Sequence, residues 1–237
     1  MFISLGQNCA SVTHYVKNKI MKKKNEGRLS CPFDLMITSY TGLCKLFNSS
    51  FEDMLKDISV YDNIHNIKYK DKYLFYSKSL NKPYNNDLIC NKKLGLYFNH
   101  ESPGNPILYK TEKWASKYLF TENNFKKFYN RYNDRINNLK KYINSAIKNN
   151  TIIYFILNTN VTPFKLVNII KNKYPTLKFK ILCNKIDKEL EYFLTIFEKD
   201  FCNYEIIDEK KYDSKYSDNY VIMNGWDNNK NINILQL

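Results

Sequence analysis

Apolar and polar positions follow two periods along this chain, and the pattern is clearest in the C-terminal half. An uninterrupted apolar run at 152–157 is typical of a strand buried on both faces of a parallel sheet, and the mostly apolar segment 179–183 predicts a second strand. A further run at 204–208 predicts a third strand, and helical patterns fall between these strands, one starting near Pro163 and one over 188–199. Strands that alternate with helices in this way predict a parallel sheet with right-handed crossovers.

The N-terminal segment shows the same strand-to-helix order. Residues 2–5 are apolar and predict a buried strand, Gly6 marks a turn, and Val12, Val16 and Ile20 recur at helical spacing. The sequence therefore predicts a helix from Cys9 to about Ile20. This first strand and helix most simply join the parallel sheet of the C-terminal half.

The middle of the chain contains mixed signals. Ser39 predicts the cap of a helix through Phe47, and Ser50 with Asp53 resembles a capping box for a short helix. Alternation around Lys70-Asp71 predicts a hairpin, and residues 94–98 predict another strand. A long helix is predicted over 122–148, where the apolar positions follow helical spacing along one face. Its apolar stripe contains Phe125, Phe128, Tyr132, Ile136, Leu139 and Ile143, with Arg135 at the same spacing.

Taken together, the elements predict an α/β fold with a mostly parallel sheet and helices on both faces, in a Rossmann-like three-layer arrangement. The whole chain, 1–237, is expected to form a single α/β domain, with a small β-rich insertion or cap around 60–120. A chain of 237 residues with 43% hydrophobic residues is long enough to bury a core of this size.

The composition is strongly basic, with a formal net charge of +14. Such a charge favours a polyanionic partner such as nucleic acid or an anionic glycan. The lysines are scattered through the chain, however, and abundant Asn, Lys, Ile and Tyr are typical of an AT-rich genome. Nucleic-acid binding is therefore allowed but not favoured.

The cysteines favour a reducing compartment. None of the six lies in a CxxC pair or at metal-ligand spacing, so we expect free thiols and no metal site. No signal peptide and no membrane-spanning run is visible, and the expected location is cytoplasmic, away from the membrane. Neither a phosphate loop nor GxGxxG occurs, so no cofactor is expected.

Cys9 is the first candidate for chemistry. A cysteine in the opening turn of a helix lies where unpaired backbone N–H groups and the helix dipole stabilise a thiolate. Gly6 allows close backbone approach, and the amides of Gln7 and Asn8, with nearby backbone N–H groups, are candidate oxyanion or substrate contacts. Cys9 also shares one helical stripe with Val12 and Val16, so a core role is the alternative.

The chain contains three histidines that could act as the base. His14 is five positions beyond Cys9, about 140° around the helix, and does not face the thiol. His65 lies in a polar stretch. His100 follows a predicted strand and opens a Pro/Gly loop, which is a favourable place for a site residue.

The N-terminal hundred residues resemble a family described as "putative papain-like cysteine peptidase". Members open with a strand, Ser-Leu-Gly and a Cys three residues on, followed by Pro-Phe-Asp-Trp and then by an aromatic-His element. The matching segments here are Ser4-Leu5-Gly6 with Cys9, Pro32-Phe33-Asp34 and Phe98-Asn99-His100. Leu35 replaces the family's Trp, and Glu101 stands where an Asp is common after the His.

The resemblance implies that Cys9 is a nucleophile and His100 its general base. Asp34 is our choice for the group that orients the imidazole, because Pro32 and Phe33 hold its loop; a turn-capping role is the alternative. Asn158 and Asp227 are weaker candidates. The papain signature C-G-S-C-W is missing, and the alternating strand–helix order fits a Cys version of the α/β-hydrolase turn better.

The expected function is a cysteine-dependent acyl hydrolase or transferase, peptidase-like by resemblance, acting on an acyl, peptide or glycan substrate. Two alternatives remain open. One is a non-catalytic basic module that binds nucleic acid or anionic glycan, and the other is a sugar- or glycan-modifying enzyme on the same fold.

Overall fold

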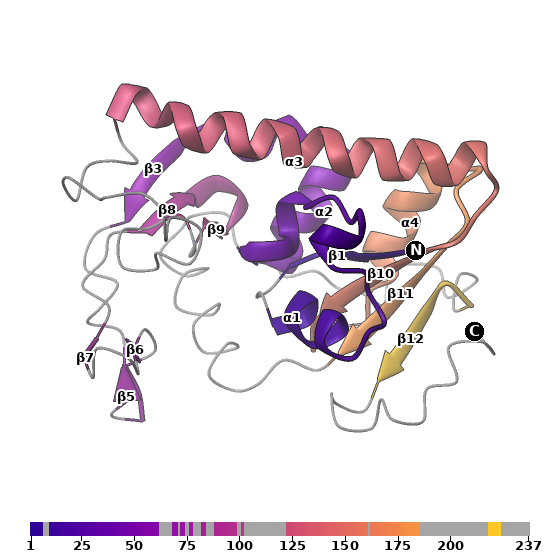
Figure 1. The fold of residues 1–237 in the computed structure, drawn as a ribbon, viewed down its shortest axis with the longest axis horizontal. Helices are drawn as coiled ribbons and strands as arrows, with labels where there is room; N and C mark the ends of the chain where they lie inside the picture. Colours follow the sequence, from indigo (N-terminus) through magenta and orange to yellow (C-terminus); the bar gives the residue numbers. More distant parts are fainter. Residues whose placement is uncertain are drawn as a thin grey trace.

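A four-stranded parallel sheet joins the start of the chain to its C-terminal half (Figure 1). The computed structural model describes residues 1–6, 10–61, 68–70, 72–73, 76–77, 82–83, 88–98, 101, 122–160, 162–184 and 218–223. The strands, in spatial order, are β1 (Phe2–Ser4), β10 (Ile153–Asn158), β11 (Phe179–Asn184) and β12 (Tyr220–Met223). Each neighbouring pair is parallel, so the carboxyl ends of all four strands lie at one edge.

Both faces of this sheet are covered by helices, because successive side chains of a strand point to opposite faces. On one face, Ile156 packs with Tyr15 of α1 (Ala10–Lys17). On the other, Phe155 belongs to the main core with α2 (Tyr40–Asn48), α3 (Glu122–Lys148) and α4 (Phe164–Lys173). The apolar runs predicted from the sequence therefore form strands buried on both faces.

A second, antiparallel sheet lies beside the first (Figure 1). Its strands, in spatial order, are β2 (Ile37–Thr38), β9 (Leu96–Phe98), β8 (Leu88–Asn91) and β3 (Ile58–Tyr61). Two small hairpins follow β3 in the chain and pair β4 (Lys68–Tyr69) with β5 (Lys72–Tyr73) and β6 (Tyr76–Ser77) with β7 (Lys82–Pro83). The 3-10 helices among the described residues are η1 (Lys24–Glu26), η2 (Pro32–Leu35), η3 (Phe51–Leu55) and η5 (Lys92–Leu94).

The long helix α3 runs across both sheets along one side of the molecule (Figure 1). Near its start, the ring of Phe128 packs edge-on against Phe98 of β9, with 4.7 Å between ring centroids. Further along, Leu139 and Ile143 enter the same core as Phe155 of the parallel sheet. The helix therefore fastens the two sheets to each other.

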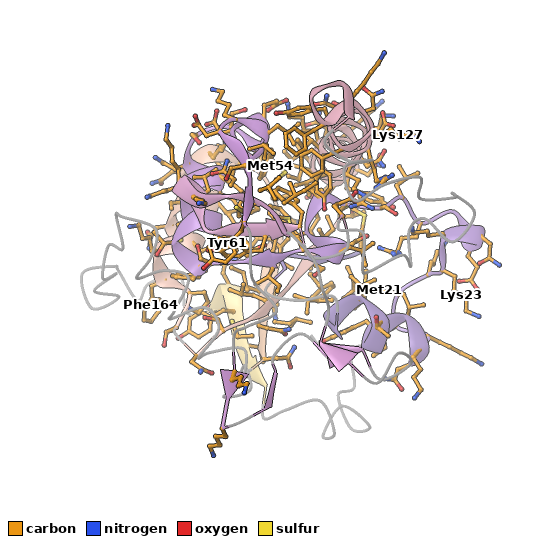
Figure 2. All side chains as sticks on the ribbon, turned by 90° about the vertical axis from the view of Figure 1, so that its left-hand side faces the viewer. Met21, Lys23, Met54, Tyr61, Lys127 and Phe164 are labelled. Carbon is orange, nitrogen blue, oxygen red and sulfur yellow. The ribbon has the colours of Figure 1, made fainter. Side chains whose placement is uncertain are left out.

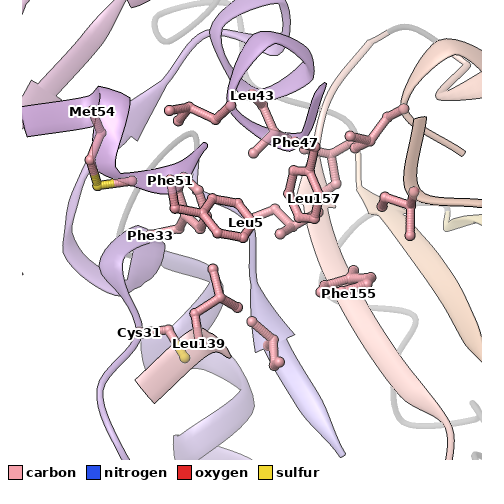
Figure 3. Close-up of a cluster of buried hydrophobic side chains, with 14 of the residues drawn as sticks. Leu5, Cys31, Phe33, Leu43, Phe47, Phe51, Met54, Leu139, Phe155 and Leu157 are labelled. Carbon is pink, nitrogen blue, oxygen red and sulfur yellow. The ribbon is translucent and has the colours of Figure 1, made fainter. Parts of the chain in front are cut away.

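The core between the sheets is rich in aromatic rings (Figure 3). Phe47 of α2 lies edge-on to Phe51 at 5.0 Å and to Phe155 at 5.9 Å. Outside this core, long polar side chains such as those of Lys23 and Lys127 point away from the body (Figure 2). The scattered lysines therefore include solvent-facing positions.

Most predicted elements are confirmed, with boundaries within a few residues. The long helix occupies 122–148 as predicted, and the hairpin around Lys70-Asp71 is present as β4–β5. The Ser39 hydroxyl accepts from the Gly42 N–H at 3.0 Å, as expected for the cap of α2. The helix predicted over 188–199 and the strand over 204–208 lie outside the described residues.

Two details differ from the prediction. The element after Ser50 is a 3-10 helix, and half of the predicted capping box is present: the Asp53 carboxylate accepts from the Ser50 N–H, whereas the Ser50 hydroxyl contacts the Glu52 carboxylate and makes no cap. Strand β12 was not predicted.

The described parallel strands follow chain order without the reversal that marks the Rossmann fold. The structure thus confirms a mixed α/β fold with a parallel sheet, while the Rossmann-like three-layer arrangement stays a prediction.

Candidate active site

The carboxyl end of β1 is pressed against the antiparallel sheet at Gly6. The N–H of Leu5 still bonds to the Ile156 carbonyl at 2.9 Å, and the N–H of Gly6 turns to the Ser4 hydroxyl at 3.2 Å. Gly6 has φ +90°, and a Cβ there would overlap Oγ1 of Thr38 and lie 3.0 Å from its Cβ. Glycine is therefore required, both for its backbone conformation and for the close approach of β2.

Helix α1 starts one residue after Cys9, since Ala10 is its first residue. Gln7, Asn8 and Cys9 themselves lie outside the described residues, so their predicted roles stay predictions. The helix that would stabilise a thiolate is present at the predicted place.

The described cysteines are all free and buried. Burial raises the pKa of the Cys183 thiol to about 12. It also raises the pKa of Cys90 and, well above the ordinary value, that of Cys31. Cys44 is buried as well. Because the thiolate is the reactive form, at least the three with raised pKa values are poor nucleophiles.

Asp34 lies in η2, almost completely buried. Its Oδ2 accepts from Nη1 of Arg28 at 2.7 Å and from the N–H of Cys31 at 3.1 Å. Its Oδ1 is buried and has no hydrogen-bond partner among the described residues. Burial raises the pKa of Asp34, and the Arg28 guanidinium opposes the increase. Asp34 thus caps its turn with Oδ2, and its Oδ1 can accept a hydrogen bond from a further donor.

Asp34 precedes β2 and the segment with His100 follows β9, so both adjoin the same end of the β2–β9 ladder. Ile37 lies opposite Tyr97 and Thr38 opposite Leu96 in the antiparallel pairing of β2 with β9. Asp34 comes three residues before β2, and His100 comes two residues after β9. In an antiparallel ladder the residue before one strand and the residue after its partner belong to the same end.

Asn99 and His100 lie outside the described residues, whereas Phe98 and Glu101 on either side are described. The N–H of Glu101 donates to the carbonyl of Phe98 at 2.9 Å. The two ends of the segment Phe98–Glu101 are therefore held together. The distance from His100 to Cys9 stays untested.

Polar residues line the carboxyl edge of the parallel sheet next to Gly6. Asn158 of β10 lies opposite Asn184 of β11, and both are buried. The N–H of Thr159 donates to the Asn184 carbonyl at 2.7 Å. Burial raises the pKa of Tyr15. Asn158 therefore lies at this edge, whereas Asp227 is outside the described residues.

The sequence prediction missed the arginines around Asp34 and Glu101. Arg135 is buried, and its Nη1 lies 3.8 Å from Oε1 of Glu101. The pKa of Lys24 is lowered, first by burial and then by Arg135, Arg28 and Arg131. One signal was available: an arginine at core spacing on the long helix needs a buried acid as partner.

A cavity of about 380 Å³ lies at the opposite end of β1. It is lined by Met1, Phe2, Ile20, Met21, Lys22, Glu26, Gly27, Arg28 and Tyr142. Arg28 lines this cavity and also donates to Asp34. In the described part of the chain no cluster of three or more His, Cys, Asp or Glu residues could hold a metal, and no helix is long and apolar enough to cross a membrane.

Comparison with known proteins identifies a family. The model of a family described as "putative papain-like cysteine peptidase" matches residues 1–188. No curated protein and no solved structure matches the chain. The match extends beyond the first hundred residues and includes α3, β10 and β11, so it spans the elements that surround Gly6, Asp34 and Glu101.

Proposed function

The chain belongs to the family described as "putative papain-like cysteine peptidase", and on this premise we propose that it is a cysteine-dependent acyl hydrolase or acyltransferase. Cys9 is the nucleophile, His100 is the general base, and Asp34 orients the imidazole. The chemistry needs these three groups in hydrogen-bond sequence, from thiol to imidazole to carboxylate.

The buried Oδ1 of Asp34 is the observation that carries this proposal. A buried polar group without a partner costs about 1–3 kcal/mol, and an ionised carboxylate costs more. A ring N–H is a donor of the right kind. Its position supports His100 in particular, because Asp34 and the His100 segment leave the same end of the β2–β9 ladder. Arg28 holds the other oxygen and fixes the orientation of the carboxylate.

The geometry around Gly6 supports Cys9 as the nucleophile. Gly6 is fixed against Thr38, and Thr38 belongs to β2, which pairs with the strand that leads to His100. Cys9 is three residues from Gly6 and directly precedes α1. The start of the helix favours a thiolate and supplies backbone N–H groups for an oxyanion, together with the amides of Gln7 and Asn8.

The reaction follows from these roles. His100 accepts the thiol proton as the sulfur of Cys9 attacks the acyl carbonyl, which forms a tetrahedral oxyanion. The intermediate collapses when the leaving group takes the proton from the imidazolium, and an acyl-thioester remains on Cys9. Water gives hydrolysis, and another nucleophile gives transfer, with His100 removing its proton. The acyl donor is a peptide, an ester or a thioester.

The pH dependence of Cys9 alkylation tests the proposal. We expect iodoacetamide, followed by mass spectrometry of the digested protein, to label Cys9 well below pH 8.5, the ordinary pKa of a thiol. Cys31, Cys44, Cys90 and Cys183 are buried internal controls and should react only after unfolding. In His100→Ala and in Asp34→Asn the apparent pKa of Cys9 should rise towards the ordinary value.

An activity screen complements the labelling. The chain is assayed with activated acyl esters, thioesters and peptides, and Cys9→Ala should abolish any turnover. An ordinary Cys9 pKa that does not respond to His100→Ala would overturn the proposal. Salt-sensitive polyanion binding that Cys9→Ala leaves intact, without turnover, would instead support the basic binding module.

A further inference from the structure

Glu101, the residue that follows His100, is fully buried and contacts two arginines of α3. Nη1 of Arg131 hydrogen-bonds to its Oε2, and Nη1 of Arg135 lies 3.8 Å from its Oε1. Arg131 and Arg135 are four residues apart, so they share one face of the helix. A buried carboxylate with two guanidinium partners is held in a fixed place, because leaving it unpaired is costly.

The residue two positions before His100 is fastened to the same helix face. The ring of Phe98 lies 4.7 Å from that of Phe128 and 4.8 Å from that of Tyr132, both edge-on. The Arg135 guanidinium lies over the Tyr132 ring at 4.8 Å. Aromatic packing and ion pairing therefore anchor Phe98 and Glu101 on neighbouring turns of α3.

From this arrangement we propose that α3 positions His100, with Glu101, Arg131 and Arg135 acting as positioning residues. The inference rests on the proposed function, because it concerns the presentation of His100 to Asp34 and Cys9. Consecutive Cα atoms are about 3.8 Å apart, so the backbone of His100 cannot leave the neighbourhood of Glu101. None of the three positioning residues has to touch the substrate.

The charges of this region give opposite expectations for the pKa of His100, depending on whether its position is lost. The described charged groups near Asp34 and Glu101 are the cations Lys24, Arg28, Arg131 and Arg135. Removing a cation raises the pKa of a nearby histidine by electrostatics alone. Losing the position of His100 has the opposite effect, because the imidazole separates from the Asp34 carboxylate.

The experiment is an NMR titration of the histidine side chains in the full chain. With three histidines, His100→Gln assigns the His100 signal. We expect Arg131→Gln to lower the pKa of His100 by about 0.5 unit or more. Glu101→Asp, which keeps the charge but shortens the reach, should lower it as well. An unchanged or raised pKa of His100 in Arg131→Gln would overturn the proposal.

A matched control uses the other described ion pair between α3 and the body. Lys140, about two and a half turns beyond Arg131, pairs with the half-buried Glu52 of η3. Glu52→Gln should leave the His100 titration unchanged. Arg131 has a side chain that is 25% exposed, so its variant is expected to fold even where Glu101→Gln does not.

Parallel alkylation of Cys9 separates this inference from the proposed function. If wild-type Cys9 reacts as an ordinary thiol while His100 responds to Arg131→Gln, the proposed function is overturned and the positioning of His100 stands. If Cys9 is activated but His100 does not respond, the positioning by α3 is overturned and the proposed function stands.

Discussion

At the scale of single residues, Gly6 is constrained both by its positive φ and by its contact with Thr38. Gly27 shares the first constraint and lacks the second. Gly6 and Gly27 have nearly the same backbone angle, with φ of +90° and +88°. A Cβ at Gly6 meets Thr38, whereas a Cβ at Gly27 meets nothing within 4 Å. Gly27→Ala should cost about 1–2 kcal/mol from backbone strain. Gly6→Ala should cost roughly 1–3 kcal/mol more, because it also overpacks the junction with β2.

Urea unfolding of both variants measures the difference. Thr38→Ala, added to Gly6→Ala, removes the nearer of the two clashing atoms and should restore part of the lost unfolding free energy. Equal effects of Gly6→Ala and Gly27→Ala would mean that the contact with Thr38 does not constrain the turn before Cys9.

Asp34 makes stability depend on pH with a sign opposite to that of most carboxylates. Burial raises its pKa in the folded chain, so the folded state binds the proton more tightly than the unfolded state. Its contribution to the unfolding free energy is therefore present below about pH 3.9, the unfolded value, and is lost as the pH rises through the folded pKa. Asp34→Asn should remove this downward slope in unfolding free energy.

Glu52 is the control with the opposite sign. Hydrogen bonds from Lys140 and Ser50 lower its pKa to about 2, so its contribution is present above about pH 4.3 and is lost as the pH falls towards 2. The effect should be small, because the side chain is 45% exposed. Urea unfolding of Asp34→Asn and Glu52→Gln at pH values from 2 to 7 tests both predictions. If Asp34→Asn keeps the wild-type slope of unfolding free energy against pH, the prediction for Asp34 is contradicted.

Single residues were predictable where the reason for them is local. The cap at Ser39 was correct, because a hydroxyl before a helix satisfies N–H groups within its own turn. The capping box at Ser50 was half correct, since Asp53 accepts from the Ser50 N–H while Glu52 binds the Ser50 hydroxyl. Arg135 was recognised as part of the helix stripe, but its partner Glu101 comes from a different part of the chain, and local spacing holds no information about that pairing.

At the scale of elements, Asn91 joins the end of β8 to η3. Its amide group donates to the carbonyls of Lys56 at 2.7 Å, Asp53 at 3.2 Å and Met54 at 3.3 Å. Its Oδ1 accepts from the N–H of Leu94 at 3.1 Å. Asn91→Ala should lower the unfolding free energy by about 2–4 kcal/mol, because several buried backbone groups lose their partner.

Asn149→Ala is the matched control. The Asn149 side chain is exposed at the end of α3 and donates to the Ser145 hydroxyl at 3.1 Å, so the change should stay within about 0.5 kcal/mol. Chemical denaturation compares the two variants. Asn91→Asp should be worse than Asn91→Ala at neutral pH, since it places a charge opposite three carbonyl oxygens. Equal stability of all three variants would show that Asn91 does not hold the junction.

Long elements with a strong period were predictable, and short ones were not. Helix α3 was located from its apolar stripe, β10 from an uninterrupted apolar run, and β11 from the mostly apolar segment 179–183. Strand β12 and the 3-10 helices have too few residues for a period to be visible. The pairing of β2 with β9 joins segments far apart in sequence, so the ladder end shared by Asp34 and the His100 segment could be found only from the structure.

At the scale of the whole molecule, one hydrophobic core draws on both sheets. It includes Ile89 and Phe98 of the antiparallel sheet and Phe155 and Ile181 of the parallel sheet, with Leu139 of α3 between them. Separate domains would each have a core of their own. The shared core therefore predicts one cooperative unfolding transition, and the single domain expected for 1–237 stays a prediction.

Two buried cysteines report on the two sheets separately. Cys90 lies in β8 of the antiparallel sheet, and Cys183 lies in β11 of the parallel sheet. Both are buried with raised pKa values, so each becomes reactive only when its own sheet opens. Pulse labelling with a maleimide across a urea series, read by mass spectrometry, should give the same midpoint for both thiols. An earlier midpoint for Cys90 would mean that the antiparallel sheet unfolds by itself, and the end of β9 would then be released while the turn after β1 is still folded.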